Sequence, residues 1–304
     1  MSGRRKPLAI DRLAIGYFGV TGLVALLFGG LPGAGITTAH ALIIFGIIRL
    51  ASSDPRAGLR GVIRASYAVL LTPALYAELA VLNRFVTQRY FDTTVQGWDA
   101  AMFGGQPSME LSTLLPWLPF SEVLHLGYFA YYAIVPAALI GVYRTRGFDA
   151  LHRTACAVTG AFFVSYLIFT FFPVAGPRYE FVRIGGEIGD GTLYRLVHGI
   201  LETGSSKGTA FPSSHIAASL AAVVAAGRED ARWFWLLIVP EIALTIGTVY
   251  GRFHYAADAL VGALLALAVC LAVYGPGSGL AVRATHGPSH GIRTDDLGDD
   301  PREG

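Results

Sequence analysis

The stretch WFWLLIVPEIALTIGTVYGRFHYAADALVGALLALAVCLAVY, residues 233–274, decides the fold. It contains two apolar runs, 233–250 and 255–274, which are separated only by Gly-Arg-Phe-His. Each run is close to the roughly 20 apolar residues that a helix needs to cross the hydrocarbon core of a bilayer. We therefore expect two transmembrane helices joined by a short turn that carries an arginine and a histidine.

Similar apolar runs occur along most of the chain. The other runs cover 13–31, 34–50, 62–82, 123–143, 151–174 and 213–226. With 53% hydrophobic and 14% charged residues, the chain is more apolar than a soluble domain. We predict an all-α integral membrane protein in which residues 1–274 form a single polytopic domain of about eight transmembrane helices.

The basic residues predict the orientation of these helices, because lysine and arginine near span ends favour the cytoplasmic side. One set of loops and ends contains most of them: Arg4, Arg5, Lys6, Arg12, Arg56, Arg60, Arg144, Arg146, Arg153, Arg228 and Arg232. The opposite loops, 83–122 and 175–212, carry bases and acids in near balance. We therefore expect both termini to be cytoplasmic and the protein to lie in the plasma (inner) membrane. The first run is long for a cleavable signal and should remain as an anchor. The tail, 275–304, is predicted to be disordered.

Other features of the composition narrow the function. The formal net charge is only +2, without a cluster of basic and aromatic residues, so no nucleic-acid partner is expected. Cys156 and Cys270 lie inside apolar runs and have no zinc-ligand spacing. The outer loop at 83–121 contains tryptophans beside glycines, which suits an ordinary aromatic belt or a segment that covers the lipid-entry side of a site.

Three polar segments are predicted to meet at the non-cytoplasmic face. They are Gly-Pro-Arg-Tyr at 176–179, Phe-Pro-Ser-Ser-His at 211–215 and Gly-Arg-Phe-His-Tyr-Ala-Ala-Asp at 251–258. Each stands next to the end of a predicted span on that side. This convergence predicts a functional site between 171 and 258.

In the third segment, His254 and Asp258 are four residues apart and would share one face of a helix. The carboxylate of Asp258 could accept the Nδ1 proton of His254, which leaves Nε2 free to attack an electrophile. The alternatives are a purely structural pair or two ligands of a metal ion. Since no third strong ligand is visible in the sequence, we expect no metal.

In the second segment, a proline followed by Ser213 and Ser214 is typical of a helix start. A helix beginning there would point free backbone N–H groups and its positive dipole end toward an anionic phosphate. His215 would stand beside that phosphate as a candidate general acid. An ordinary capped helix with an interfacial histidine is the alternative.

Cations flank both histidines. Arg178 follows a Gly-Pro turn, Arg252 precedes His254 by two residues, and Lys207 is a looser candidate. The guanidinium fork can hold two phosphate oxygens at once. A single outer arginine can instead contact lipid headgroups, so the arginines are informative mainly because they bracket the histidines.

These segments resemble the type-2 phosphatidic acid phosphatase superfamily, which has a basic first motif, a Pro-Ser-x-His second motif and a third motif ending in His-x-x-x-Asp. The resemblance covers roughly residues 123–274 and implies a six-helix phosphatase-like core. It implies that His254 is a nucleophile that forms a phosphohistidine, that Asp258 orients it, and that His215 is the acid. It also implies that Arg178 and the backbone of Ser213 and Ser214 hold the phosphate, without a metal or other cofactor.

The chain departs from the superfamily pattern in its cations. The usual first motif would place a lysine at Phe171, and the usual third motif would place a serine at Gly247 and an arginine at Thr248. Arg252 is therefore expected to substitute for a missing phosphate ligand. The His-Tyr-x-x-Asp sequence is more similar to the inositol phosphorylceramide synthase and sphingomyelin synthase branch than to simple phosphatases.

The sequence thus predicts a membrane lipid phosphohydrolase or phosphotransferase that acts on a lipid phosphate, a lipid diphosphate or a phospholipid headgroup. The acceptor would be water or an alcohol such as inositol. A transporter or flippase of phosphorylated lipids is the alternative, because Glu78 and Glu241 lie within predicted spans. A catalytically inactive scaffold fits the intact His215, His254 and Asp258 less well.

Overall fold

The computed structural model describes residues 7–51 and 58–276, and the predicted disordered tail lies outside these residues from 277 onward. Within the described part, the regular elements are all α-helices. The chain is therefore an all-α membrane protein, as the apolar runs predict.

In the part of the chain that the structure describes, six helices are long and apolar enough to cross a membrane. They are α1 (Ala9–Phe28), α2 (Gly30–Leu50), α3 (Gly58–Val86), α8 (Phe148–Phe171), α13 (Ala231–Tyr250) and α14 (Ala256–Tyr274). Two further helices, α6 (Leu118–Phe129) and α7 (Tyr131–Arg146), pass the same test together and are bent by 46° relative to each other. The shorter α12 (Ser214–Glu229) lies among them. Each predicted apolar run thus coincides with one of these helices or with the bent pair.

The core of the bundle is formed by α8 and α12, which pack against each other. Most side chains of α8 are buried, and α12 buries a series of alanines on its faces. Small side chains let the backbones of membrane helices approach closely. The helices α7, α13 and α14 pack against α12, and α3 packs against α8.

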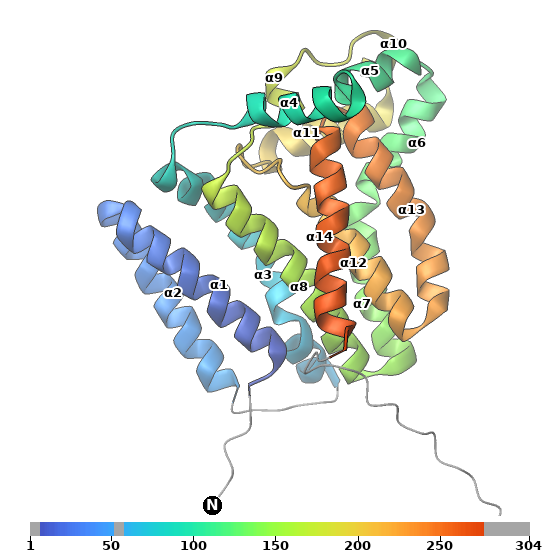
Figure 1. The fold of residues 1–304 in the computed structure, drawn as a ribbon. Coiled ribbons are helices and arrows are strands. Elements are labelled where there is room, and N and C mark those ends of the chain that lie inside the picture. The colour runs from blue at the N-terminus through green and yellow to red at the C-terminus, as the bar shows by residue number, and fades with distance from the viewer. Residues whose placement is uncertain (1–6, 52–57, 277–304) are drawn as a thin grey trace, which may run out of the picture.

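Five shorter helices gather at one end of the bundle, opposite the end at which α1 begins (Figure 1). They are α4 (Asp92–Phe103), α5 (Pro107–Leu114), α9 (Pro177–Glu180), α10 (Gly186–Gly189) and α11 (Thr192–Gly204). The loop at 83–121 therefore contains α4 and α5. The three polar segments also lie at this end: one forms α9, one begins α12, and one connects α13 to α14.

Candidate active site

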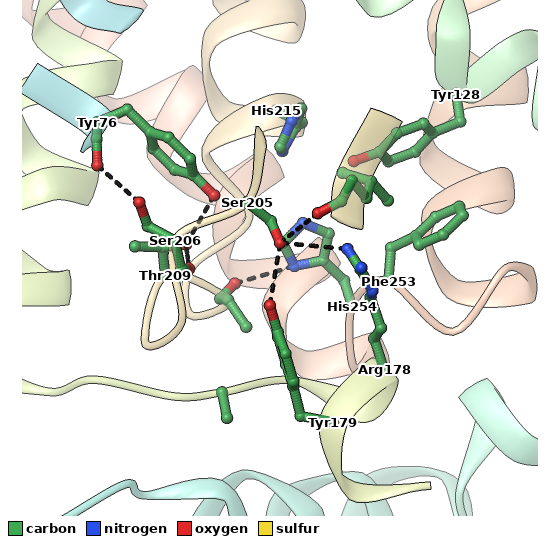
Figure 2. Close-up of a pocket in the computed structure, with 13 residues that line it drawn as sticks. Tyr76, Tyr128, Arg178, Tyr179, Ser205, Ser206, Thr209, His215, Phe253 and His254 are labelled. Atoms are coloured by element: carbon green, nitrogen blue, oxygen red, sulfur yellow. Dashed lines mark hydrogen bonds between the residues drawn. The ribbon is translucent and has the colours of Figure 1, made fainter. Parts of the chain in front are cut away.

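A small cavity of about 40 Å³ lies under the short helices, where the three polar segments meet. His215, His254 and Arg178 line it together (Figure 2). His215 lies in the first turn of α12, His254 precedes α14, and Arg178 lies in α9. The structure therefore brings together one predicted residue from each segment.

His254 is held in the turn between α13 and α14 and is only 4% exposed. Its Nδ1 lies 2.9 Å from the carbonyl oxygen of Ala210 and 3.4 Å from Oδ2 of Asp258. Because a carbonyl oxygen can only accept, this contact places the proton on Nδ1 and leaves the lone pair on Nε2. Burial lowers the pKa of His254 to about 4, so the imidazole is neutral at pH 7.

Asp258 has a second role in this turn. Its Oδ2 accepts a hydrogen bond from the backbone N–H of Tyr255 at 2.8 Å, which caps the start of α14. The carbonyl oxygen of Asp258 accepts from the backbone N–H of Ser213 at 3.0 Å. Asp258 therefore joins the start of α14 to the start of α12, while the Ala210 carbonyl is the nearer partner of His254 Nδ1.

His215 lies in the first turn of α12, where Ser213 is the N-cap and its hydroxyl accepts from the N–H of Ile216 at 3.4 Å. The rings of His215 and His254 are 5.8 Å apart, centroid to centroid. Tyr131 packs against the other side of His215 at 4.5 Å. Among the described residues, Nδ1 of His215 has no hydrogen-bond partner. The two imidazoles thus line the same small cavity.

Arg178 is the cation of this cavity. Its Nη1 donates to the hydroxyl of Ser205 at 3.2 Å, and that hydroxyl also contacts the hydroxyl of Tyr179 at 3.0 Å. Both contacts are visible in Figure 2. Since only part of the guanidinium fork is used by Ser205, Arg178 still has donors for an anion.

Arg252 is not in this cavity. It adopts a left-handed backbone conformation with φ of 59° in the turn after α13. Its guanidinium donates to the carbonyl of Val182 and, at 3.1 Å, to the hydroxyl of Ser112. The expected substitute for a missing phosphate ligand is therefore engaged with the short helices at this end of the bundle and their connections.

The remaining predicted phosphate ligands lie around the cavity. Ser214 lines a second, larger cavity of about 210 Å³, which shares His215 with the first. The ammonium of Lys207 lies over the rings of Tyr90 and Tyr179, at 4.8 and 5.3 Å from their centroids. Lys207 is not among the residues that line the small cavity.

Several lining residues were not predicted from the sequence. Tyr76 comes from α3, and its hydroxyl lies 2.8 Å from that of Thr209. Ser205 and Ser206 follow α11, a helix that buries Tyr194, Val197 and His198. The three- and four-residue spacing of these buried side chains is typical of a helix and could have indicated α11 from the sequence. The hydroxyl residues themselves have no distinctive pattern.

The two intramembrane glutamates lie elsewhere. Glu78 in α3 pairs with His40 in α2, with 3.0 Å between Oε1 and Nε2. Glu241 is buried in α13. Neither residue lines the cavity that contains the two histidines.

The fold and the cavity together define a membrane protein with a buried histidine, a half-buried histidine and an arginine at one end of its helical bundle. The model of the PAP2 superfamily matches residues 103–272, which is more than half of the chain and includes all three polar segments. The chain belongs to the PAP2 superfamily. Comparison with curated proteins and with solved structures gives no significant match. Membership supports a phosphatase-type activity on lipid phosphates.

Proposed function

We propose that this protein is a lipid phosphohydrolase or phosphotransferase that works through a phosphohistidine at His254. The observation that carries the proposal is the shared cavity, in which a neutral, buried imidazole with a free Nε2 faces a second imidazole and an arginine. Attack at phosphorus needs an aligned nucleophile, donors for the equatorial oxygens and a proton for the leaving oxygen. His254, Arg178 and His215 can supply these in turn.

In the first step, Nε2 of His254 attacks phosphorus and the bond from phosphorus to the leaving oxygen breaks. Arg178 and the free N–H groups in the first turn of α12 stabilise the charge on the remaining oxygens. The negative charge of the bound phosphate favours the protonated form of His215, which then gives its proton to the departing alkoxide or phosphate. The Ala210 carbonyl, with Asp258 nearby, stabilises the positive charge that develops on the His254 ring.

In the second step, an acceptor hydroxyl attacks the phosphohistidine. His215, now neutral, takes the proton of the acceptor, and the bond between phosphorus and Nε2 breaks to restore neutral His254. Water as acceptor gives hydrolysis, whereas an alcohol such as inositol or a lipid hydroxyl gives transfer. The His-Tyr-x-x-Asp motif, which resembles the inositol phosphorylceramide synthase and sphingomyelin synthase branch, makes transfer part of the proposal.

We further propose that the cavity opens on the non-cytoplasmic face of the plasma membrane. The opposite ends of two helices support this orientation: Arg144 and Arg146 lie in the last turn of α7, and Arg228 lies in the last turn of α12. Basic residues at span ends favour the cytoplasm. The cavity is at the start of α12, which is the other side of the bundle.

The direct test is an assay of the purified protein with lipid phosphates, lipid diphosphates and phospholipids in the presence of EDTA. We expect release of phosphate, or transfer of a headgroup when candidate alcohols are added, without a divalent ion. Activity that strictly requires a divalent ion would contradict the metal-independent mechanism. Movement of intact phosphorylated lipid across proteoliposomes, without chemical conversion, would favour the transporter alternative.

Arg178 and Arg252 make a matched pair of variants, because one lines the cavity and the other does not. Arg178→Ala is expected to lower kcat/KM by about 10²-fold, since loss of a charged donor to the reacting group typically has this effect. Arg252→Ala should have a much smaller effect on the rate per folded molecule. Initial rates, normalised to the monodisperse fraction in size-exclusion chromatography, measure both. A larger loss for Arg252→Ala would contradict the assignment of Arg178.

A further inference from the structure

The helix α4 carries two buried carboxylates that are not part of the catalytic cavity. Asp92 is 4% exposed and Asp99 is fully buried. With Gln96 they are spaced four and three residues apart, so all three lie on one face of α4. Figure 1 shows α4 lying across the end of the bundle, above α14. Because a buried carboxylate is costly unless it is hydrogen-bonded, the partners of Asp92 and Asp99 are informative.

Asp92 binds two of the polar segments at once. Its carboxylate accepts from the backbone N–H groups of Ala175 and Gly176, at 2.9 and 2.8 Å. It also accepts from the hydroxyl of Tyr255 at 3.0 Å. Gly176 is two residues before Arg178, and Tyr255 directly follows His254. One carboxylate therefore fixes the backbone beside the cation and the side chain of the residue beside the nucleophile.

Asp99 binds the start of α14. Its carboxylate accepts from the backbone N–H groups of Ala256 and Ala257, at 3.1 and 2.8 Å. These are first-turn N–H groups, which have no partner within their own helix. A negative charge at a helix N-terminus is also favourable. Asp99 thus holds the helix that begins two residues after His254.

We infer that Asp92 and Asp99 are positioning residues, through which α4 holds Arg178 and His254 at the spacing that the reaction needs. The inference rests on the proposed function. Neither carboxylate lines the cavity, so both act through the groups that they hold: backbone N–H groups for Asp99, and backbone N–H groups with the Tyr255 hydroxyl for Asp92. Both also precede residues 103–272, so they lie outside the part of the chain that matches the PAP2 superfamily model.

The two residues predict different kinetic effects. Asp92→Asn replaces an acceptor oxygen by an NH₂ group that faces N–H and O–H donors, which loosens the segment of Arg178 and weakens the hold on phosphate. We expect KM to rise about tenfold with little change in kcat. Asp99→Asn loosens the start of α14 and should instead lower kcat about tenfold with little change in KM. General destabilisation would not separate the two constants in this way.

A double-mutant cycle between Asp92→Asn and Arg178→Ala tests the inference, with orthovanadate as the competitive probe of the phosphate site. If Asp92 acts through Arg178, each single variant raises the inhibition constant of vanadate, and the double variant is within about twofold of Arg178→Ala alone. Fold-changes that multiply in the double variant would overturn the inference. Glu180→Gln, which removes an exposed carboxylate near Arg178, is the control and should leave the constant unchanged.

This experiment separates the inference from the proposed function on which it rests. The first possible result is that turnover depends on His254 but the fold-changes in the vanadate inhibition constant multiply in the double variant. In that case only the positioning role of Asp92 fails. If turnover is unaffected by loss of His254, the proposed function fails first. Should Asp92→Asn not fold, the separation of kcat from KM in Asp99→Asn tests α4 independently, and a parallel loss in both constants would overturn the inference.

Discussion

His254→Ala is expected to lower kcat by at least about 10⁴-fold, since removal of a catalytic nucleophile leaves only the contribution of binding and charge stabilisation. Among the residues that the structure describes, His215 is the only other histidine that lines the cavity, and the mechanism already uses it as the acid and base. The measurement is the initial rate on the best lipid phosphate, at saturating substrate.

A matched control for this variant is His152→Ala. His152 is also a buried histidine, but it lies in α8 and does not line the cavity. The folded fraction of this control should retain most of the wild-type rate. Thermal unfolding of both variants checks that the loss in His254→Ala is chemical. An undiminished rate in folded His254→Ala would contradict the nucleophile assignment.

The second large effect is expected for His215→Ala, which should slow turnover of a lipid phosphate by about 10³-fold, within the range that general acid–base groups contribute. The role of His215 as an acid can be tested by comparing substrates whose leaving oxygens differ in their need for a proton. An aryl phosphate has a leaving oxygen that needs no proton, so its first turnover should be largely spared and the phosphoenzyme should accumulate.

Rapid mixing with p-nitrophenyl phosphate measures this first turnover as a burst of p-nitrophenolate. In His215→Ala the burst should be followed by a slow steady state, because the same imidazole activates the acceptor in the second step. A first turnover that is slowed equally for lipid and aryl phosphates would show that His215 does not protonate the leaving oxygen.

The long helices and the meeting of the three polar segments could be predicted because membrane spans impose a strict pattern on the sequence. Apolar runs give the helices, and their alternation across the membrane places residues 176–179, 211–215 and 251–258 at one end. Even the short run at 213–226 predicts α12 correctly. The location of the site could therefore be predicted from the apolar runs.

The contacts within the site could not be predicted in the same way. The nearest partner of His254 Nδ1 is the carbonyl of Ala210, and every residue has a carbonyl, so no side-chain pattern indicates it. The direction of Arg252 depends on the unusual φ of its turn. The hydrogen bonds of Asp92 join residues that are far apart in the chain, and these depend on how α4 lies over the bundle.

The most direct test of the account is to trap the phosphorylated enzyme. Substrate labelled with ³²P in the transferred phosphoryl group is mixed with the protein, quenched with alkali within milliseconds, and the labelled peptide is identified by mass spectrometry. The account predicts a label that is stable to alkali, labile to acid and located on His254, and that is absent from His254→Ala. Turnover without any covalent label, or a label on another residue, would contradict it.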